Sequence, residues 1–251
     1  MKKSTMTIAG LDPSGGAGII ADLKTFNSYN IYGTSVITAL TAQNPKKVTN
    51  IMAIDTNFII EQIDLIMDEY PIEYIKTGML YSDKIIKVIS KKIKEYNLKT
   101  IVDPVMVSES GSNLVDKTYI DSMKKYLLPL AYIITPNINE AEKLSNITIK
   151  TEEDMITTSK LLNKYTNTTI ITGGHMQGTD ILCIDDEIYK IKGNLIKSNN
   201  THGTGCTYSS SITCELINNK TIHDAAINSK NYVKESIKQG YYNTPNQFWK
   251  K

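Results

Sequence analysis

Short apolar stretches typical of strands alternate with amphipathic stretches typical of helices along the whole chain, and this alternation restricts the possible folds. Residues 56–69 and 82–96 have apolar side chains at helical spacing, whereas 99–102 and 131–135 are short and rich in β-branched residues. Such an order predicts a mainly parallel sheet with helices on both faces. No linker, repeat or low-complexity block interrupts the pattern, so we expect residues 1–251 to form a single α/β domain.

Glycines and polar residues recur at the points where the predicted strands end. They are Gly10, Gln43, Gly78, Asp103, Asn137 and Gly173. In open α/β sheets, ligands bind at the carboxyl ends of the strands. The sequence therefore predicts one cleft that is assembled from segments far apart in the chain.

Two glycine-containing loops stand directly before predicted helices. The first, 12–18, follows a strand but lacks the Gly-x-Gly-x-x-Gly spacing of dinucleotide sites. The second contains Gly203, Thr204 and Gly205, followed by Cys206 in the first turn of a helix. Helix N-termini attract anions, and their dipole lowers the pKa of a nearby thiol. Residues 203–205 are thus a candidate anion hole; the alternative is a loop that only caps a core helix.

Composition narrows the class of protein. A net charge of +2 gives no electrostatic signature of nucleic-acid binding, and every one of the 28 basic residues is lysine. Any phosphate must therefore be bound without an arginine fork. Three cysteines without Cys-x-x-Cys spacing indicate neither a disulfide framework nor a zinc site, so we expect a cytoplasmic protein. No apolar run is long enough to span a membrane, and the start of the chain does not read as a signal peptide.

Three motifs in their chain order resemble one known family. They are Asp-Pro-Ser-Gly-Gly-Ala-Gly at 12–18, Thr-Ala-Gln-Asn at 41–44 and His-Gly-Thr-Gly-Cys-Thr at 202–207. Together they resemble the hydroxymethylpyrimidine and phosphomethylpyrimidine kinases of thiamine biosynthesis, within the ribokinase-like superfamily. The resemblance covers essentially the whole chain. It implies a three-layer sandwich and transfer of the ATP γ-phosphoryl group to 4-amino-5-hydroxymethyl-2-methylpyrimidine and then to its monophosphate.

The resemblance also implies a role for each matching position. Asn137 and Glu140 match an Asn-x-x-Glu element that orders Mg²⁺ near the nucleotide phosphates, and Asp103 would join this metal network. Cys206 occupies the place of the catalytic Asp of related sugar kinases and is the candidate base. The residues that would surround the aminopyrimidine are Gly10, Ala17, Asp22, Gln43, Met79 and Val105. Gln43 can both donate and accept hydrogen bonds at the pyrimidine edge.

One position departs from the family pattern. Thr172 precedes Gly173-Gly174-His175 where many relatives have lysine. The ATP phosphates would then need another cation, for which Lys76 is a candidate, or a greater reliance on Mg²⁺. Other readings of single residues remain open: Gln43 could cap a strand, Asp103 could be a turn residue, and Met79 could be core. His202 is expected to shape its loop rather than to catalyse.

Two rival functions remain. Pyridoxal kinases have related sequences, but some carry a cysteine in the loop that here runs from 107 to 113 and contains Ser108 and Ser110 instead. This difference favours the pyrimidine. We expect the same loop to order over bound ligands. The other rival is a non-catalytic pyrimidine-binding protein, which the retention of Asn137, Glu140 and the Gly-Thr-Gly-Cys segment at 203–206 disfavours. A homodimer is expected, with no nucleic-acid or membrane partner.

Overall fold

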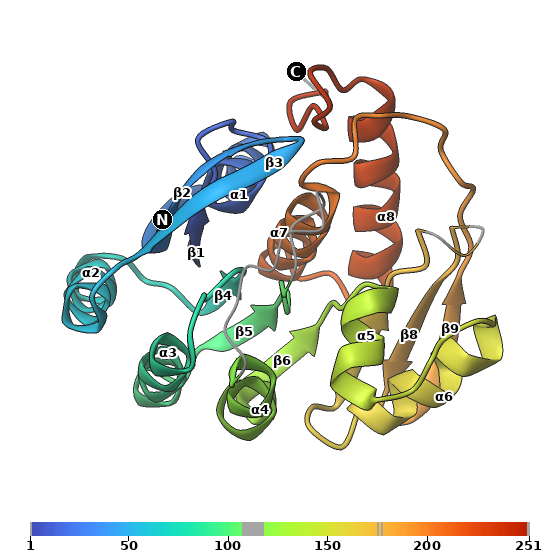
Figure 1. Ribbon diagram of the computed structural model, residues 1–251, viewed down its shortest axis with the longest axis horizontal. Coiled ribbons are helices and arrows are strands. Elements are labelled where there is room, and N and C mark those ends of the chain that lie inside the picture. Colours follow the sequence, from blue (N-terminus) through green and yellow to red (C-terminus); the bar gives the residue numbers. More distant parts are fainter. Residues whose placement is uncertain (1, 107–117, 175, 177, 250–251) are drawn as a thin grey trace.

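The computed structural model describes residues 2–106, 118–174, 176 and 178–249, and its elements alternate as the sequence predicts (Figure 1). The loop at 107–113, predicted to act as a lid, lies outside the described residues. The strands are β1 (Ser4–Leu11), β2 (Tyr32–Asn44), β3 (Lys47–Ala53), β4 (Tyr74–Thr77), β5 (Lys99–Val102), β6 (Ala131–Ile134), β7 (Thr168–Ile171), β8 (Asp180–Ile184) and β9 (Glu187–Ile191). The helices are α1 (Gly18–Ser28), α2 (Thr56–Glu69), α3 (Asp83–Glu95), α4 (Tyr119–Ser122), continued by η1 (Met123–Leu127) and η2 (Leu128–Leu130), α5 (Ile138–Ser145), α6 (Glu152–Leu162), α7 (Thr204–Ile217) and α8 (Ile222–Lys238).

The strands form one sheet in the order β3-β2-β1-β4-β5-β6-β7-β8-β9. Six neighbouring strands of this sheet, β2, β1, β4, β5, β6 and β7, run parallel to one another. Both edges are antiparallel, because β3 returns along β2 and the β8–β9 hairpin returns along β7. The carboxyl ends of the parallel strands therefore lie at one edge of the sheet, where the sequence predicts a cleft.

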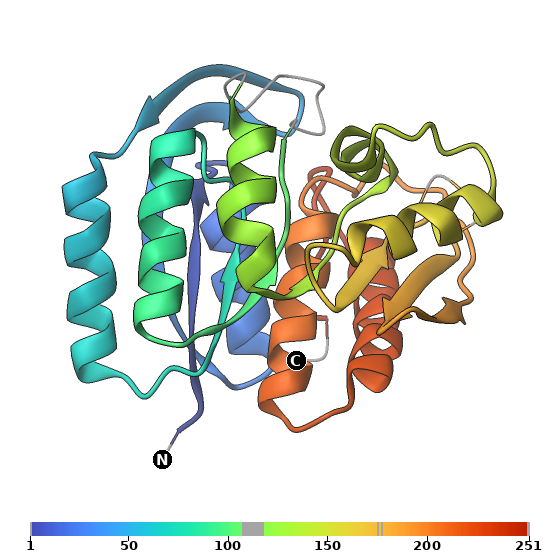
Figure 2. The same ribbon diagram turned by 90° about the horizontal axis from the view of Figure 1, so that it is seen from below.

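Helices cover both faces of the sheet and confirm the three-layer α/β architecture. Helices α1, α7 and α8 lie on one face, while α2 to α6 lie on the other (Figures 1 and 2). Successive strand residues serve opposite faces, as the pleat requires. Ile101, Ile133 and Ile170 pack beneath α7 and α8, whereas Val102, Ile134 and Ile171 belong to the core on the other face.

Local signals explain several element boundaries. Thr151 and Asp154 form a capping box at the start of α6, with each side chain accepting from the other residue's backbone N–H. Asp185 and Asp186 form the turn of the β8–β9 hairpin, and both residues adopt positive φ (46° and 69°), as tight two-residue hairpin turns require. Within the described residues, no helix is both long and apolar enough to cross a membrane.

Candidate active site

A buried cluster of three charges lies under the carboxyl ends of β4 and β5. Lys76, at 0% exposure, places its Nζ 3.0 Å from both carboxylate oxygens of Asp22 and 3.7 Å from Asp103 Oδ2. Burial alone lowers the pKa of a lysine, but Asp22, Cys206 and Asp103 outweigh it and raise the pKa of Lys76 above its ordinary value. Lys76 is therefore a permanent cation inside the protein.

Hydroxyl groups complete this cluster and connect it to α7. Thr7 Oγ1 donates to Asp22 Oδ2 at 2.6 Å, and Ser210 Oγ donates to Asp22 Oδ1 at 2.8 Å. Ser209 Oγ donates to Asp103 Oδ2 at 3.2 Å. Two consecutive serines of α7 thus bind the two carboxylates that surround Lys76. These contacts hold the first turns of α7 against β1, β4 and β5.

This geometry changes the roles expected for Asp22 and Lys76. The Asp22 side chain is fully buried, and its oxygens accept from Thr7, Lys76 and Ser210. Lys76 is equally buried and is held by carboxylates. The two side chains therefore contact each other inside the protein, and the sequence pattern did not reveal this pairing.

Cys206 lies where the N-termini of two helices converge. It is the third residue of α7, and its sulfur accepts a hydrogen bond from the backbone N–H of Gly18, the first residue of α1. The prediction of a lowered thiol pKa is wrong for the free protein. Burial, the largest effect, together with Asp103 and Asp22, raises the pKa of Cys206 to about 12, although Lys76 and the Gly18 N–H act in the opposite sense. The thiol is therefore protonated at neutral pH.

The candidate anion hole begins at a glycine with a special backbone conformation. Gly203 has φ +92°, and a Cβ placed on it would lie 1.8 Å from the carbonyl oxygen of Gly16. Only glycine permits this close approach of the 12–18 loop to the start of α7. Thr204 and Gly205 follow as the first helical residues. The Thr204 N–H donates to the carbonyl oxygen of Thr201 at 3.0 Å, whereas the Gly205 N–H lies in the first turn, where the helix itself supplies no acceptor.

The remaining residues predicted to contact the pyrimidine form an apolar corner beside these loops. Met79 packs with Ala39 and the partly buried Val105. Gly10 lies at a bulge of β1, and a Cβ there would come 2.4 Å from Met79 Cε. The side chain of Gln43, near the end of β2, is partly exposed and hydrogen-bonds the Asp12 carboxylate.

Asn137 and Glu140 have a structural role that the sequence did not reveal. They form a capping box at the start of α5: Asn137 Oδ1 accepts from Glu140 N–H, and Glu140 Oε2 accepts from Asn137 N–H, each at 3.0 Å. Burial, followed by the nearby charge of Asp103, raises the pKa of Glu140 to about 8. Burial, the largest effect, and the charge of Asp22 also raise the pKa of Asp103, although Lys76 and Ser209 act in the opposite sense. Two such buried carboxylates are a donor set that suits a hard divalent cation.

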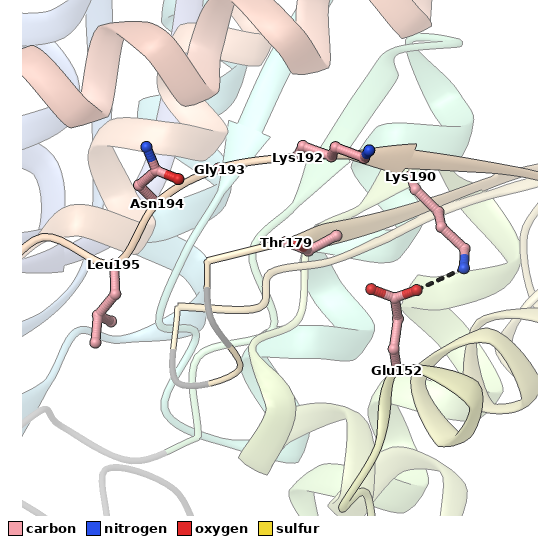
Figure 3. Close-up of a pocket in the computed structure, with 7 residues that line it drawn as sticks. All are labelled: Glu152, Thr179, Lys190, Lys192, Gly193, Asn194 and Leu195. Carbon is pink, nitrogen blue, oxygen red and sulfur yellow. Dashed lines mark ion pairs between the residues drawn. The ribbon is translucent and has the colours of Figure 1, made fainter.

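A hollow of about 810 Å³ lies at the β8–β9 end of the sheet (Figure 3). Its lining residues are Glu152, Thr179, Lys190, Lys192, Gly193, Asn194 and Leu195. Lys190 pairs with Glu152 on one side, while Asn194 and Leu195 lie on the other (Figure 3). Gly173 packs on the carbonyl oxygen of Thr179, so the loop after β7 borders this hollow. Cys206 and Gln43 do not line it.

Comparison with known proteins identifies the family. The sequence profile of the family described as phosphomethylpyrimidine kinase matches residues 12–247. The chain belongs to the phosphomethylpyrimidine kinase family. Members of this family are phosphotransferases, and the expected kinase assignment and the ribokinase-like fold are confirmed at this level.

Three relatives illustrate the match. The chain is 40% identical over 240 residues to the thiamine biosynthesis bifunctional protein ThiED of Geobacter sulfurreducens, covering 94% of this chain but only 49% of that protein. A crystal structure of phosphomethylpyrimidine kinase from Clostridium difficile is 40% identical, with a TM-score of 0.84, covering 94% of this chain and 100% of that one. Pyridoxal kinase from Staphylococcus aureus, solved with AMP-PCP and pyridoxal, is 30% identical, with a TM-score of 0.89 and coverage of 99% and 94%.

Several residues that contact the buried charge cluster or the 12–18 loop were not singled out from the sequence. Thr7, Ser209 and Ser210 read as ordinary strand and helix residues, yet all three donate to the buried carboxylates. The run Ser209-Ser210-Ser211 in a buried helix was the available signal, because such hydroxyls need partners. Asp12 was noted only as part of its loop, although it contacts His202, Ala17 and Gln43.

Proposed function

We propose that this protein transfers the γ-phosphoryl group of ATP to 4-amino-5-hydroxymethyl-2-methylpyrimidine and then to its monophosphate, as a step of thiamine biosynthesis. The observation that carries the proposal is the convergence of the N-termini of α1 and α7 at Cys206, above the strand ends. Two helix N-termini offer backbone N–H groups that can stabilise the negative charge of the phosphoryl group during its transfer. Such transfer depends mainly on positioning and charge stabilisation.

The pyrimidine would bind at the apolar corner of Met79 and Val105, with Gly10 leaving room for Met79. The Gln43 amide would hydrogen-bond the edge of the aminopyrimidine, and the backbone of the loop at Ala17 would contact the same ring. Asp22 would act from below the site by holding Ser210 and Lys76. This placement keeps the ring of the substrate beside the loops that carry the anion hole.

ATP would lie between the anion hole and the hollow beside Gly193, with its phosphates near Asn137 and Thr172. The isolated bridge between Asn137 and Thr172 brings these two residues together. Mg²⁺ would be held near Asp103 and Glu140, where it would neutralise two buried carboxylates and the phosphate oxygens.

Lys192, which is exposed and lines the hollow, replaces Lys76 as our candidate for the missing phosphate-binding lysine. Lys192→Gln is then expected to raise the KM for ATP more than the KM for the pyrimidine. An unchanged KM for ATP would remove Lys192 from this role.

Cys206 would stand next to the hydroxyl of the substrate. Because its thiol is protonated in the free protein, we propose that it first orients the alcohol, and that it can act as the base only after phosphates and Mg²⁺ have changed the local charge. Cys206→Ser keeps the shape and the hydrogen-bonding capacity but is a far poorer base. A base role therefore predicts a loss of about 10²–10⁴-fold in kcat, whereas orientation alone predicts a few-fold loss.

A substrate panel tests the function directly. Purified protein with Mg-ATP is offered the pyrimidine alcohol, its monophosphate, pyridoxal and pyridoxine, and ADP release is measured for each. We expect both pyrimidines to turn over with the highest kcat/KM. ADP release with the vitamin B6 compounds alone would support the pyridoxal kinase alternative, which the similarity to the S. aureus enzyme keeps in view. Binding of the pyrimidine without ATP turnover would indicate a binding protein.

We also propose a cytoplasmic homodimer. Large apolar side chains are exposed on β3 and α2, with Met52 at 60%, Phe58 at 55% and Leu65 at 72% exposure. Exposed apolar side chains that gather into one patch mark association surfaces, and these three come from two elements that follow each other in the chain. Light scattering coupled to gel filtration should give twice the chain mass, and Leu65→Lys should reduce it. A monomeric parent protein would exclude this proposal.

A further inference from the structure

A buried carboxylate and a buried imidazole meet where two loops from opposite ends of the chain touch. Asp12 lies just after β1 and His202 just before α7, and they are 1% and 8% exposed. His202 Nε2 lies 2.7 Å from Asp12 Oδ2. Burial alone raises the pKa of a carboxyl, but hydrogen bonds led by those of His202 and Ser14 lower the pKa of Asp12 to about 2. Asp12 is thus ionised and can only accept, so His202 donates through Nε2–H.

Asp12 also holds the loop that would approach the pyrimidine. Its Oδ1 accepts from Ser14 N–H at 2.8 Å, and its Oδ2 accepts from Ala17 N–H at 2.9 Å. The Gln43 side chain is a further hydrogen-bond partner. Because a carboxylate only accepts, Gln43 must donate through its amide nitrogen. Its carbonyl oxygen is then the group that it can offer to an amino group of a ligand.

Backbone contacts leave little freedom between the two loops. The carbonyl oxygen of Gly16 lies against Gly203, and a Cβ on Gly16 would come 2.6 Å from the imidazole of His202. His202 N–H donates to Asn243 O at 3.1 Å, so the C-terminal turn supports the same contact from a third side. The ion–imidazole contact is therefore the polar centre of a close junction between three segments.

We propose that Asp12 and His202 form a positioning pair that sets the anion-hole loop against the substrate loop and orients the Gln43 amide. The catalytic part of this inference rests on the proposed function, whereas the link between the loops does not. Neither residue needs to touch the reacting atoms. A displacement of about 1 Å between two halves of an active site can cost about 10²-fold in rate, which is the scale of effect open to such a pair.

The test compares His202→Leu, which removes the donor, with His202→Gln, whose amide nitrogen can reproduce Nε2. Thr169→Val is the control, because it removes a partly buried side-chain hydrogen bond (Thr169 Oγ1 to Asn163 Oδ1, 2.7 Å) on β7, outside this junction. Amide hydrogen exchange of residues 12–18 is measured for each variant, together with kcat, the KM for the pyrimidine and the KM for ATP.

We expect His202→Leu to accelerate exchange at 12–18, although the substitution lies about 190 residues away in sequence, and to lower kcat by about 10–100-fold with the KM for ATP within about twofold. His202→Gln should recover most of the exchange protection at 12–18 and most of kcat, and Thr169→Val should change neither quantity. Unchanged exchange at 12–18 in His202→Leu would overturn the pair. If His202→Leu does not fold, His202→Phe, which keeps a ring but lacks the Nε2–H donor, carries the same exchange measurement. An inactive parent protein would reject the proposed function, while the exchange result would still decide the link between the loops.

Discussion

Lys76 provides the sharpest test of the buried charge cluster. Replacing it with methionine keeps most of the side-chain volume but removes the cation that Asp22 and Asp103 share. Removing one partner of a buried ion pair costs about 3–5 kcal/mol, because the remaining charge is left without compensation. Asp22 keeps its bonds from Thr7 and Ser210, which limits the penalty, but Asp103 is affected as well. We therefore expect Lys76→Met to lower the free energy of unfolding by about 3–5 kcal/mol at pH 7.

The assay is urea unfolding followed by circular dichroism at pH 7. Lys87→Met is the matched control, because Lys87 also forms a lysine–aspartate pair at 2.7 Å, with Asp83, but on the surface. Exposed pairs contribute about 0–1 kcal/mol, so the control should lose little. Adding Asp22→Asn to Lys76→Met should restore part of the lost stability, since it removes one unpaired charge. A loss below about 1 kcal/mol for Lys76→Met, similar to Lys87→Met, would refute the idea that this cation stabilises the site.

Three further predictions follow from the same geometry. The pKa of Cys206 is raised from 9.0 to about 12, so its alkylation by iodoacetamide at pH 8 should be about 1,000-fold slower than that of an ordinary thiol. Mass spectrometry measures the alkylation rate, and an apparent pKa below 9 from its pH dependence would contradict this expectation. Asp12→Asn should destabilise the protein at neutral pH. The pKa of Asp12 is about 2 in the folded protein against 3.8 ordinarily, so its stabilisation is complete above pH 3.8 and is lost as the pH falls towards 2. Urea titrations at several pH values measure the difference in unfolding free energy between parent and variant. A difference that stays constant with pH would argue against this role of Asp12. Gln43→Ala should cost about 1–3 kcal/mol of pyrimidine recognition, seen as a fall in kcat/KM for the pyrimidine with the KM for ATP nearly unchanged; equal kcat/KM values would exclude Gln43 from the site.

Local sequence signals were sufficient for most of the fold. Helical periodicity predicted α2 and α3. Thr151 and Asp154 have the spacing of a capping box at the start of α6, and the adjacent Asp185 and Asp186 suit the turn of the β8–β9 hairpin. These features depend on residues a few positions apart, so the pattern in the chain contains them. The alternation of elements then leaves a mainly parallel sheet as the simplest arrangement.

The sequence by itself also placed the two glycine loops and the strand-end polar residues at one edge, because parallel strands bring their carboxyl ends together. Only the tertiary structure decided which of these groups are buried and which of them contact each other. Asp22 and Lys76 read as ligand contacts but meet each other below the site, and Cys206 lies at a helix N-terminus yet has a raised pKa. Burial and the distance between charges come from segments far apart in the chain, such as Asp12 and His202, and no local pattern encodes those distances.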